Sequence, residues 1–205
     1  MRLFCAIRPP AEALDHLSAA LGSVLRPSLG RRSPLQPRGN WHITLAFYGE
    51  LADGAVPQLV AELTERLGPI APFALELRGA GRFGRGVGWI GLGGQMERFN
   101  QARTAALTAG QSCSVDPPAA PDTRHPASHP HLTITRSAGR PALADALQAM
   151  ACYLGPSWLV RQAVLVRSEL GGGPGGHALY EPMATIPLAG PRPEGGAEHR
   201  NPYNS

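Results

Sequence analysis

NWHITLAFYG, residues 40–49, and HPHLTITR, residues 129–136, contain the same pattern of a histidine, an apolar residue and a threonine. The first stretch is rich in β-branched and aromatic residues and the second in β-branched residues, all of which are typical of strands. Because side chains alternate across a strand, the histidine and threonine of each copy share one face and the apolar residue between them points to the other. Each copy therefore predicts a strand that packs against a core and presents an imidazole beside a hydroxyl on its other face.

Chance does not account for the two copies of this pattern. Seven histidines and eight threonines among 205 residues predict roughly 0.3 such triplets. The copies are HIT at residues 42–44 and HLT at residues 131–133, so they begin 89 residues apart. A helical pattern follows each copy, and we therefore expect two comparable lobes whose motif strands meet across a cleft.

Two opposed imidazoles suit acid–base chemistry at phosphorus. In-line displacement puts the attacking and leaving oxygens on opposite sides, so one base accepts a proton while one acid donates one. The unperturbed pKa of histidine, about 6.5, allows His42 and His131 to take either role close to neutral pH. The hydroxyls of Thr44 and Thr133 can donate hydrogen bonds to the non-bridging phosphoryl oxygens and stabilise the charge that grows there.

The rest of the chain predicts short strands and helices in alternation, which indicates an α+β fold of two similar layers. Strands are expected at residues 2–7, 41–48, 73–78, 87–92, 131–136, 159–170 and 178–188. Helices are expected at residues 14–25, 55–67, 96–109 and 141–153. Residues 114–130 contain five prolines and predict a long surface loop. We assign residues 1–188 to a single bilobal domain and residues 189–205 to a flexible C-terminal tail.

Composition limits the class of protein. The formal net charge of +4 suits an anionic ligand without identifying one. Three cysteines with no C-x-x-C pair argue against a disulfide scaffold and a thiolate zinc site, so we expect a reducing cytoplasm. The apolar run at residues 3–7 is too short for a signal peptide or a membrane span. We expect no membrane partner, and a monomer.

The sequence resembles the two-histidine phosphoesterase superfamily at the two motif stretches, the opening MRLFCAI, the stretch LVRS at residues 165–168 and the later Tyr180. Within that superfamily it is most similar to the RNA 2′,3′-cyclic phosphodiesterases, also called 2′-5′ RNA ligases. The resemblance covers residues 1–188 in order. It implies a bilobal α+β fold, with two antiparallel or mixed sheets flanking a central cleft, helices on the outside, and no metal or other cofactor.

The resemblance also implies a reaction and a role for each site residue. The reaction is hydrolysis of an RNA 2′,3′-cyclic phosphate end, or of a nucleoside 2′,3′-cyclic phosphate, to a 2′-phosphomonoester, with 2′-5′ ligation as a related activity. His42 would be the proton donor to the departing 3′-oxygen, and His131 the proton acceptor that activates water. Thr44 and Thr133 would hold the phosphate. Arg136 would add positive charge near it, and Phe47 could pack against a base.

Two other interpretations remain open from the residues alone. His125, His129 and His131 form an H-x3-H-x-H pattern whose spacing permits metal ligation, which would suit a metal-dependent hydrolase. A non-catalytic RNA-binding module is the other, with Trp41, Phe47 and Tyr48 as stacking aromatics. Turnover of a small cyclic nucleotide in EDTA distinguishes the three interpretations.

Overall fold

The computed structural model describes most of the chain, namely residues 1–25, 35–84, 86–113, 129–136 and 141–190. The predicted tail therefore lies outside the described residues from residue 191 onward. Most of the predicted proline-rich loop, residues 114–128, also lies outside them, and His125 with it.

The described residues form an α+β fold, as predicted. The eight strands are β1 (Arg2–Ile7), β2 (Ile43–Glu50), β3 (Phe73–Phe83), β4 (Val87–Gly94), β5 (His131–Thr135), β6 (Leu154–Val160), β7 (Gln162–Glu169) and β8 (Leu179–Pro187). The four helices are α1 (Ala11–Leu25), α2 (Val56–Leu67), α3 (Met96–Cys113) and α4 (Pro141–Ala149). Three short 3-10 turns are η1 (Arg38–Asn40), η2 (Asp53–Ala55) and η3 (Pro174–Gly176).

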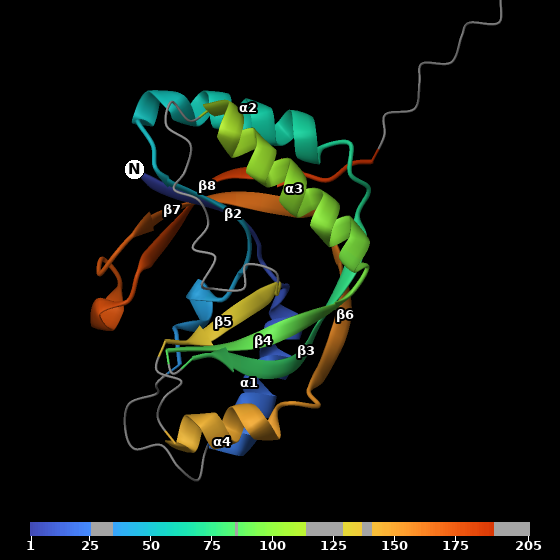
Figure 1. Cartoon of the computed structure of the whole chain (residues 1–205), viewed down its shortest axis with the longest axis vertical. Coiled ribbons are helices and arrows are strands. Elements are labelled where there is room, and N and C mark those ends of the chain that lie inside the picture. The colour runs from blue at the N-terminus through green and yellow to red at the C-terminus, as the bar shows by residue number, and fades with distance from the viewer. Residues whose placement is uncertain (26–34, 85, 114–128, 137–140, 191–205) are drawn as a thin grey trace, which may run out of the picture.

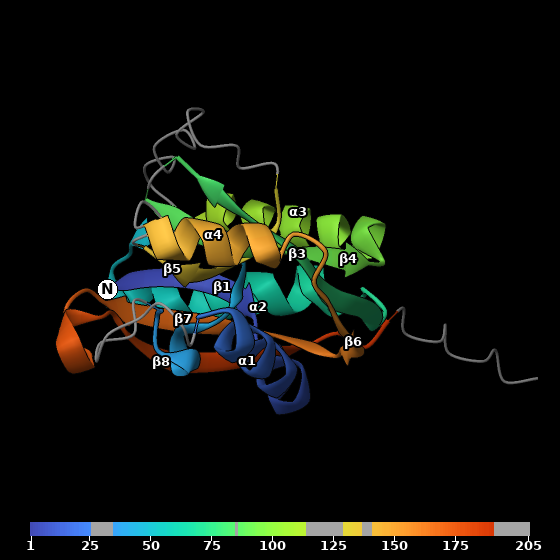
Figure 2. The ribbon, with the colours of Figure 1, turned by 90° about the horizontal axis from the view of Figure 1, so that it is seen from below.

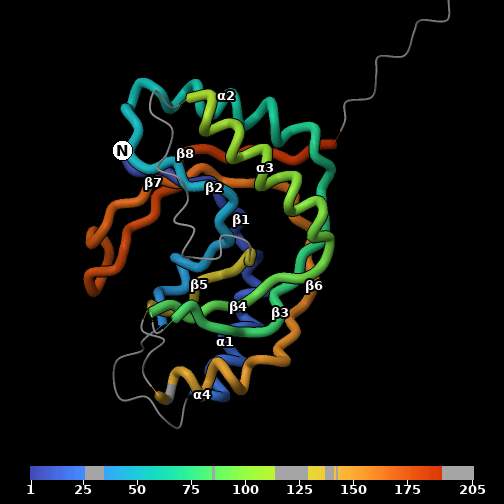
Figure 3. The backbone as a smooth tube through the Cα atoms, in the orientation of Figure 1, coloured from blue at the N-terminus to red at the C-terminus, as the bar shows by residue number. Residues whose placement is uncertain are grey.

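The strands form one continuous antiparallel sheet in the order β6-β3-β4-β5-β2-β1-β7-β8, rather than the two separate sheets that were predicted. Its halves, β6-β3-β4-β5 and β2-β1-β7-β8, join where β5 meets β2. A single residue pair, Ile43 with Leu132, is recorded at this junction. The sheet curls strongly, and Figure 3 shows the strands following one curved path. The two predicted layers are thus the halves of one sheet, joined through the motif strands.

Helices cover one face of this sheet. In Figure 1 α2 and α3 lie against one half, and α1 and α4 lie together against the other. Figure 2 shows α1 and α4 on their half from below. Alternation in β1 places Leu3, Cys5 and Ile7 in the main core with the helices. The opposite side chains of β1 belong to a second cluster made only of strand residues: Phe4, Ala6, Val164 and Val166, with Tyr180 packed against it. We call this second side of the sheet the helix-free face.

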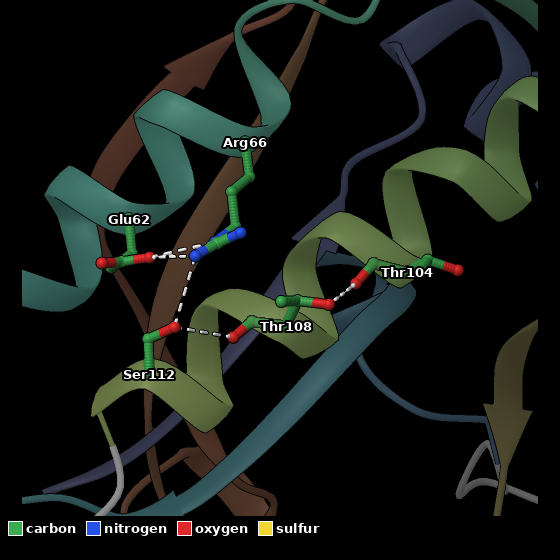
Figure 4. Close-up of polar contacts among 5 residues, drawn as sticks. All are labelled: Glu62, Arg66, Thr104, Thr108 and Ser112. Atoms are coloured by element: carbon green, nitrogen blue, oxygen red, sulfur yellow. Dashed lines mark hydrogen bonds and ion pairs between the residues drawn. The ribbon is translucent and has the colours of Figure 1, made fainter.

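Polar contacts hold α2 and α3 together on the outside of the fold (Figure 4). The guanidinium of Arg66 donates to Glu62 at 2.9 Å and to Ser112 of α3 at 3.3 Å. The Ser112 hydroxyl in turn donates to the Thr108 carbonyl.

No helix within the described parts of the chain is long and apolar enough to cross a membrane.

Three predicted boundaries differ from the structure. The strand predicted at residues 159–170 is two strands, β6 and β7, and the helix predicted at 141–153 ends at Ala149. β6 contains Pro156, which a strand accepts here because β6 lies at the edge of the sheet. β3 continues to Phe83, five residues beyond the strand predicted at residues 73–78.

Candidate active site

The junction of β2 and β5 brings the two His-x-Thr motifs side by side. Ile43 and Leu132 pair in antiparallel register and are fully buried in the main core. Continuing this register by one residue in each direction places His42 beside Thr133 and Thr44 beside His131. All four polar side chains therefore lie on the helix-free face. The two motifs are 89 residues apart in the sequence, and they are adjacent in the sheet.

Both imidazoles are held by the same hydrogen bond. Nδ1 of His42 lies 2.7 Å from the carbonyl oxygen of Asn40, and Nδ1 of His131 lies 2.8 Å from that of His129. A carbonyl oxygen can only accept, so Nδ1 of each ring carries the proton. Nε2 of each ring is then the atom that can accept or release a proton. The Asn40 side chain donates to the carbonyl of Ala178, just before β8, and so fixes this segment as well.

Two aromatic rings pack against each imidazole. The ring centroid of His42 lies 4.7 Å from that of Phe4 and 5.2 Å from that of Tyr180, which meets it edge-on. The ring of His131 is approached edge-on by Phe83 at 5.0 Å. Trp89 completes this second group, with its centroid 6.4 Å from that of His131. The aromatic rings limit how far each imidazole can turn and remove part of its solvent.

Burial and positive charge both disfavour the protonated imidazoles. Burial lowers the pKa of His42 to about 4; the hydrogen bond to Asn40 opposes this change, and the charges of Arg8, Arg136 and His131 add to it. The pKa of His131 is also lowered, mainly by burial. Arg103 and Arg136 lower it further. Arg136 thus acts on both rings, and a bound anion would oppose each of these charge effects.

The other predicted site residues lie near this pair. Thr44 and Thr133 are half-buried, and no hydrogen bond of either hydroxyl is recorded among the described residues. Arg136 is exposed just after β5. Phe47 is 60% exposed, and its ring centroid lies 5.7 Å from that of Phe4. These side chains therefore share the surroundings of the two histidines.

The aromatic residues suggested for an RNA-binding module do not act together. Trp41 is buried, and its indole Nε1 donates to the carbonyl of Gln36. Tyr48 is also buried, and its hydroxyl donates to the carbonyl of Ala106 on α3. Both rings are part of the main core, so neither is available to stack on a base in the suggested module.

The suggested metal site depends on His125, which lies outside the described residues. In the part of the chain that the structure describes, no group of three or more histidine, cysteine, aspartate or glutamate side chains is placed to hold a metal ion. Nδ1 of His131 is engaged with a carbonyl oxygen.

Sequence reasoning assigned no role to the aromatic residues that surround the imidazoles, although Tyr180 and the stretch that contains Phe4 are part of the resemblance. Phe4 and Phe83 come from strands far from the motifs in sequence, so only the strand order reveals them. Trp89 had a recognisable signal: a Cβ atom at Gly81, its partner on β3, would lie 2.4 Å from the indole ring. A glycine opposite a tryptophan in a hairpin indicates that the flat ring lies across that position.

Comparison with known proteins places the chain in a family. A family model described as the 2′-5′ RNA ligase superfamily matches residues 9–172, which include both motifs. The chain belongs to this superfamily. A search of curated protein sequences finds no significant match.

Several solved structures are similar to this chain. TT0787 of Thermus thermophilus is 26% identical, with a TM-score of 0.70, and the match covers 94% of this chain and 100% of TT0787. LigT of E. coli complexed with phosphate is 25% identical, with a TM-score of 0.66 over 91% of this chain and 96% of that one. LigT complexed with 3′-AMP has the same identity and TM-score and is covered over 97% of its length. The α+β fold is therefore that of the LigT-like proteins.

Proposed function

We propose that this protein hydrolyses RNA 2′,3′-cyclic phosphate ends to 2′-phosphomonoesters, without a metal, with His42 as proton donor and His131 as proton acceptor. The observation that carries the proposal is the junction of β2 and β5, which gathers both His-x-Thr motifs on one face of the sheet. Membership of the 2′-5′ RNA ligase superfamily supports it. The LigT complexes with phosphate and 3′-AMP agree with a phosphate-containing ligand.

The proposed step is an in-line displacement. Nε2 of His131 accepts a proton from water as the water oxygen forms a bond to phosphorus. The bond between phosphorus and O3′ breaks, and O3′ takes the proton of Nε2 of His42. The phosphate stays on O2′, and proton exchange with solvent restores the starting state of both rings. General acid and general base catalysis each contribute typically about 10²–10⁴-fold to such a rate.

The neighbouring groups stabilise this step. The hydroxyls of Thr44 and Thr133 donate to non-bridging phosphoryl oxygens, and the guanidinium of Arg136 offsets their charge. The phosphate anion also raises the lowered pKa of His42, so that substrate binding favours the protonated donor. Phe47 offers an exposed ring to the base. When the 5′-hydroxyl of a second RNA replaces water, the same groups form a 2′-5′ linkage.

The test is turnover of a nucleoside 2′,3′-cyclic phosphate in EDTA. The wild type is expected to form the 2′-phosphate, and His42→Ala and His131→Ala are each expected to lower kcat by about 10²–10⁴-fold. Circular dichroism should show an unchanged fold in both variants, because the rings lie outside the main core. Activity that requires added metal would favour a metal-dependent hydrolase using His125, His129 and His131. Binding without product would favour an RNA-binding module.

A further inference from the structure

Arg8 lies next to the proposed proton donor. The last recorded pair of β1 and β2 is Ile7 with Ile43, and Pro9 keeps the backbone of Arg8 extended. Continuing the register by one residue places Arg8 directly opposite His42, where Cβ atoms of paired residues are about 5 Å apart. Alternation along β1 puts the exposed Arg8 side chain on the helix-free face.

Arg8 differs from several other arginines in its recorded partners among the described residues. Four other arginines are engaged with carboxylates: Arg38, Arg66, Arg78 and Arg167. For Arg8, no ion pair or hydrogen bond is recorded among the described residues. Its positive charge instead acts on His42, where it opposes protonation of the imidazole. A cation beside a proton donor is unfavourable unless an anion binds to it, so this placement points to an anionic ligand.

The geometry of the reaction indicates which anion this is. In-line attack puts water on the side of His131 and the leaving O3′ on the side of His42. The ribose carries O3′, so the terminal nucleoside and the RNA before it lie on the His42 side. The next anion along that RNA is the internucleotide phosphate. Arg8 is an exposed cation next to His42 on this side of the site.

A second polar side chain flanks Arg8. β1 pairs with β7 through Ala6 and Val164, and the same register places Gln162 on the other side of Arg8 from His42. Gln162 is exposed, and its amide can donate a hydrogen bond. A guanidinium and an amide at neighbouring positions can bind one phosphate group together.

We propose that Arg8, with Gln162, binds the internucleotide phosphate before the cyclic end, so that the preferred substrate is an oligoribonucleotide 2′,3′-cyclic phosphate rather than a free nucleoside cyclic phosphate. The inference rests on the proposed function for the direction in which the RNA lies. It adds a subsite that the two His-x-Thr motifs do not supply.

The test compares a nucleoside 2′,3′-cyclic phosphate with a dinucleotide that carries the same terminal nucleoside. Arg8→Gln is expected to lower kcat/KM for the dinucleotide about tenfold more than for the mononucleoside. The reason is that only the dinucleotide loses a charge-assisted hydrogen bond, and a tenfold change is typical of one such bond at an exposed site. The effect should lie in KM, and the slope of log KM against log salt should fall by about 0.7. Arg8→Lys should retain most of the preference.

Arg2→Gln is the matched control, because Arg2 is exposed and lies on the same strand and the same face, at its far end. This variant should affect the two substrates alike. An equal loss on both substrates in Arg8→Gln, with a shifted pH profile, would mean that Arg8 acts only through the pKa of His42, and would overturn the subsite. Unchanged kinetics on both substrates would overturn it as well.

A binding measurement separates this inference from the proposed function. If the wild type turns over neither substrate, the proposed function fails. The affinities for a dinucleotide 2′-phosphate and a nucleoside 2′-phosphate then test whether Arg8 binds the internucleotide phosphate. A wild-type preference for the dinucleotide that Arg8→Gln removes would support the subsite. Equal affinities of the wild type for the two ligands would overturn it.

Discussion

Protonation of His42 is expected to destabilise the folded protein. Burial is the main reason that its pKa falls from 6.5 to about 4 in the folded state. In the unfolded chain this burial is lost and the imidazole titrates at its ordinary pKa. Between these two pH values the unfolded chain binds more protons than the folded protein, so the free energy of unfolding rises with pH. The stability from neutral His42 is thus fully present above pH 6.5 and is lost as the pH falls through 4.

The size of this effect follows from the shift in pKa. Each pKa unit corresponds to about 1.36 kcal/mol, so the change from 6.5 to about 4 predicts a loss of about 3 kcal/mol. This is a large fraction of the roughly 5–15 kcal/mol that stabilises a typical domain. His42→Gln removes the titrating group and keeps a side chain that can donate a hydrogen bond to the carbonyl of Asn40.

Urea unfolding of the wild type and of His42→Gln at pH 7, 5.5 and 4 measures this loss. The wild type should lose about 3 kcal/mol more than the variant between pH 7 and pH 4. The comparison cancels the carboxylates and other groups that titrate in both proteins. Parallel pH dependence would refute the reasoning, because it would mean that His42 titrates at its ordinary pKa in the folded protein. His131→Gln should differ from the wild type in the same direction, since the pKa of His131 is also lowered.

Two further predictions concern catalysis and packing. The pH profile of kcat/KM should be bell-shaped with its maximum below pH 6.5, because the pKa of each imidazole is lowered in the free protein. The kcat profile should lie at higher pH, since bound phosphate favours the protonated rings; a flat profile from pH 5 to 8 would contradict the acid–base pair. Gly81→Ala should lower the free energy of unfolding by about 1–3 kcal/mol and reduce kcat, because the added Cβ would lie 2.4 Å from Trp89, which packs beside His131. Gly22→Ala on α1, where a Cβ meets nothing within 4 Å, is the control and should leave kcat unchanged; equal effects of the two substitutions would contradict the prediction.

The local features of the site could be predicted from the sequence. Alternation in the two motif stretches predicted which side chains share a face, and Ile43 and Leu132 are indeed buried while His42 and His131 lie opposite them. A period of two is a property of each strand alone, so it needs no knowledge of the neighbouring strands. The α+β class followed in the same way from the alternation of helical and strand patterns.

Features that depend on strand order could not be predicted from the residues. Phe4 and Phe83 contact the two imidazoles because β1 and β3 take particular places in the sheet. The joining of the two halves was missed for the same reason. β6 begins at Leu154, five residues before the strand predicted at residues 159–170, and it contains Pro156, which a strand accepts at the edge of a sheet but not in its interior.

The pair of Ile43 with Leu132 joins the two halves of the sheet. Each histidine lies next to this pair, whereas β6 and β8 lie at the opposite edges of the sheet. The spacing of the two imidazoles is therefore set by the backbone at the junction and not by the outer strands, which are farthest from it.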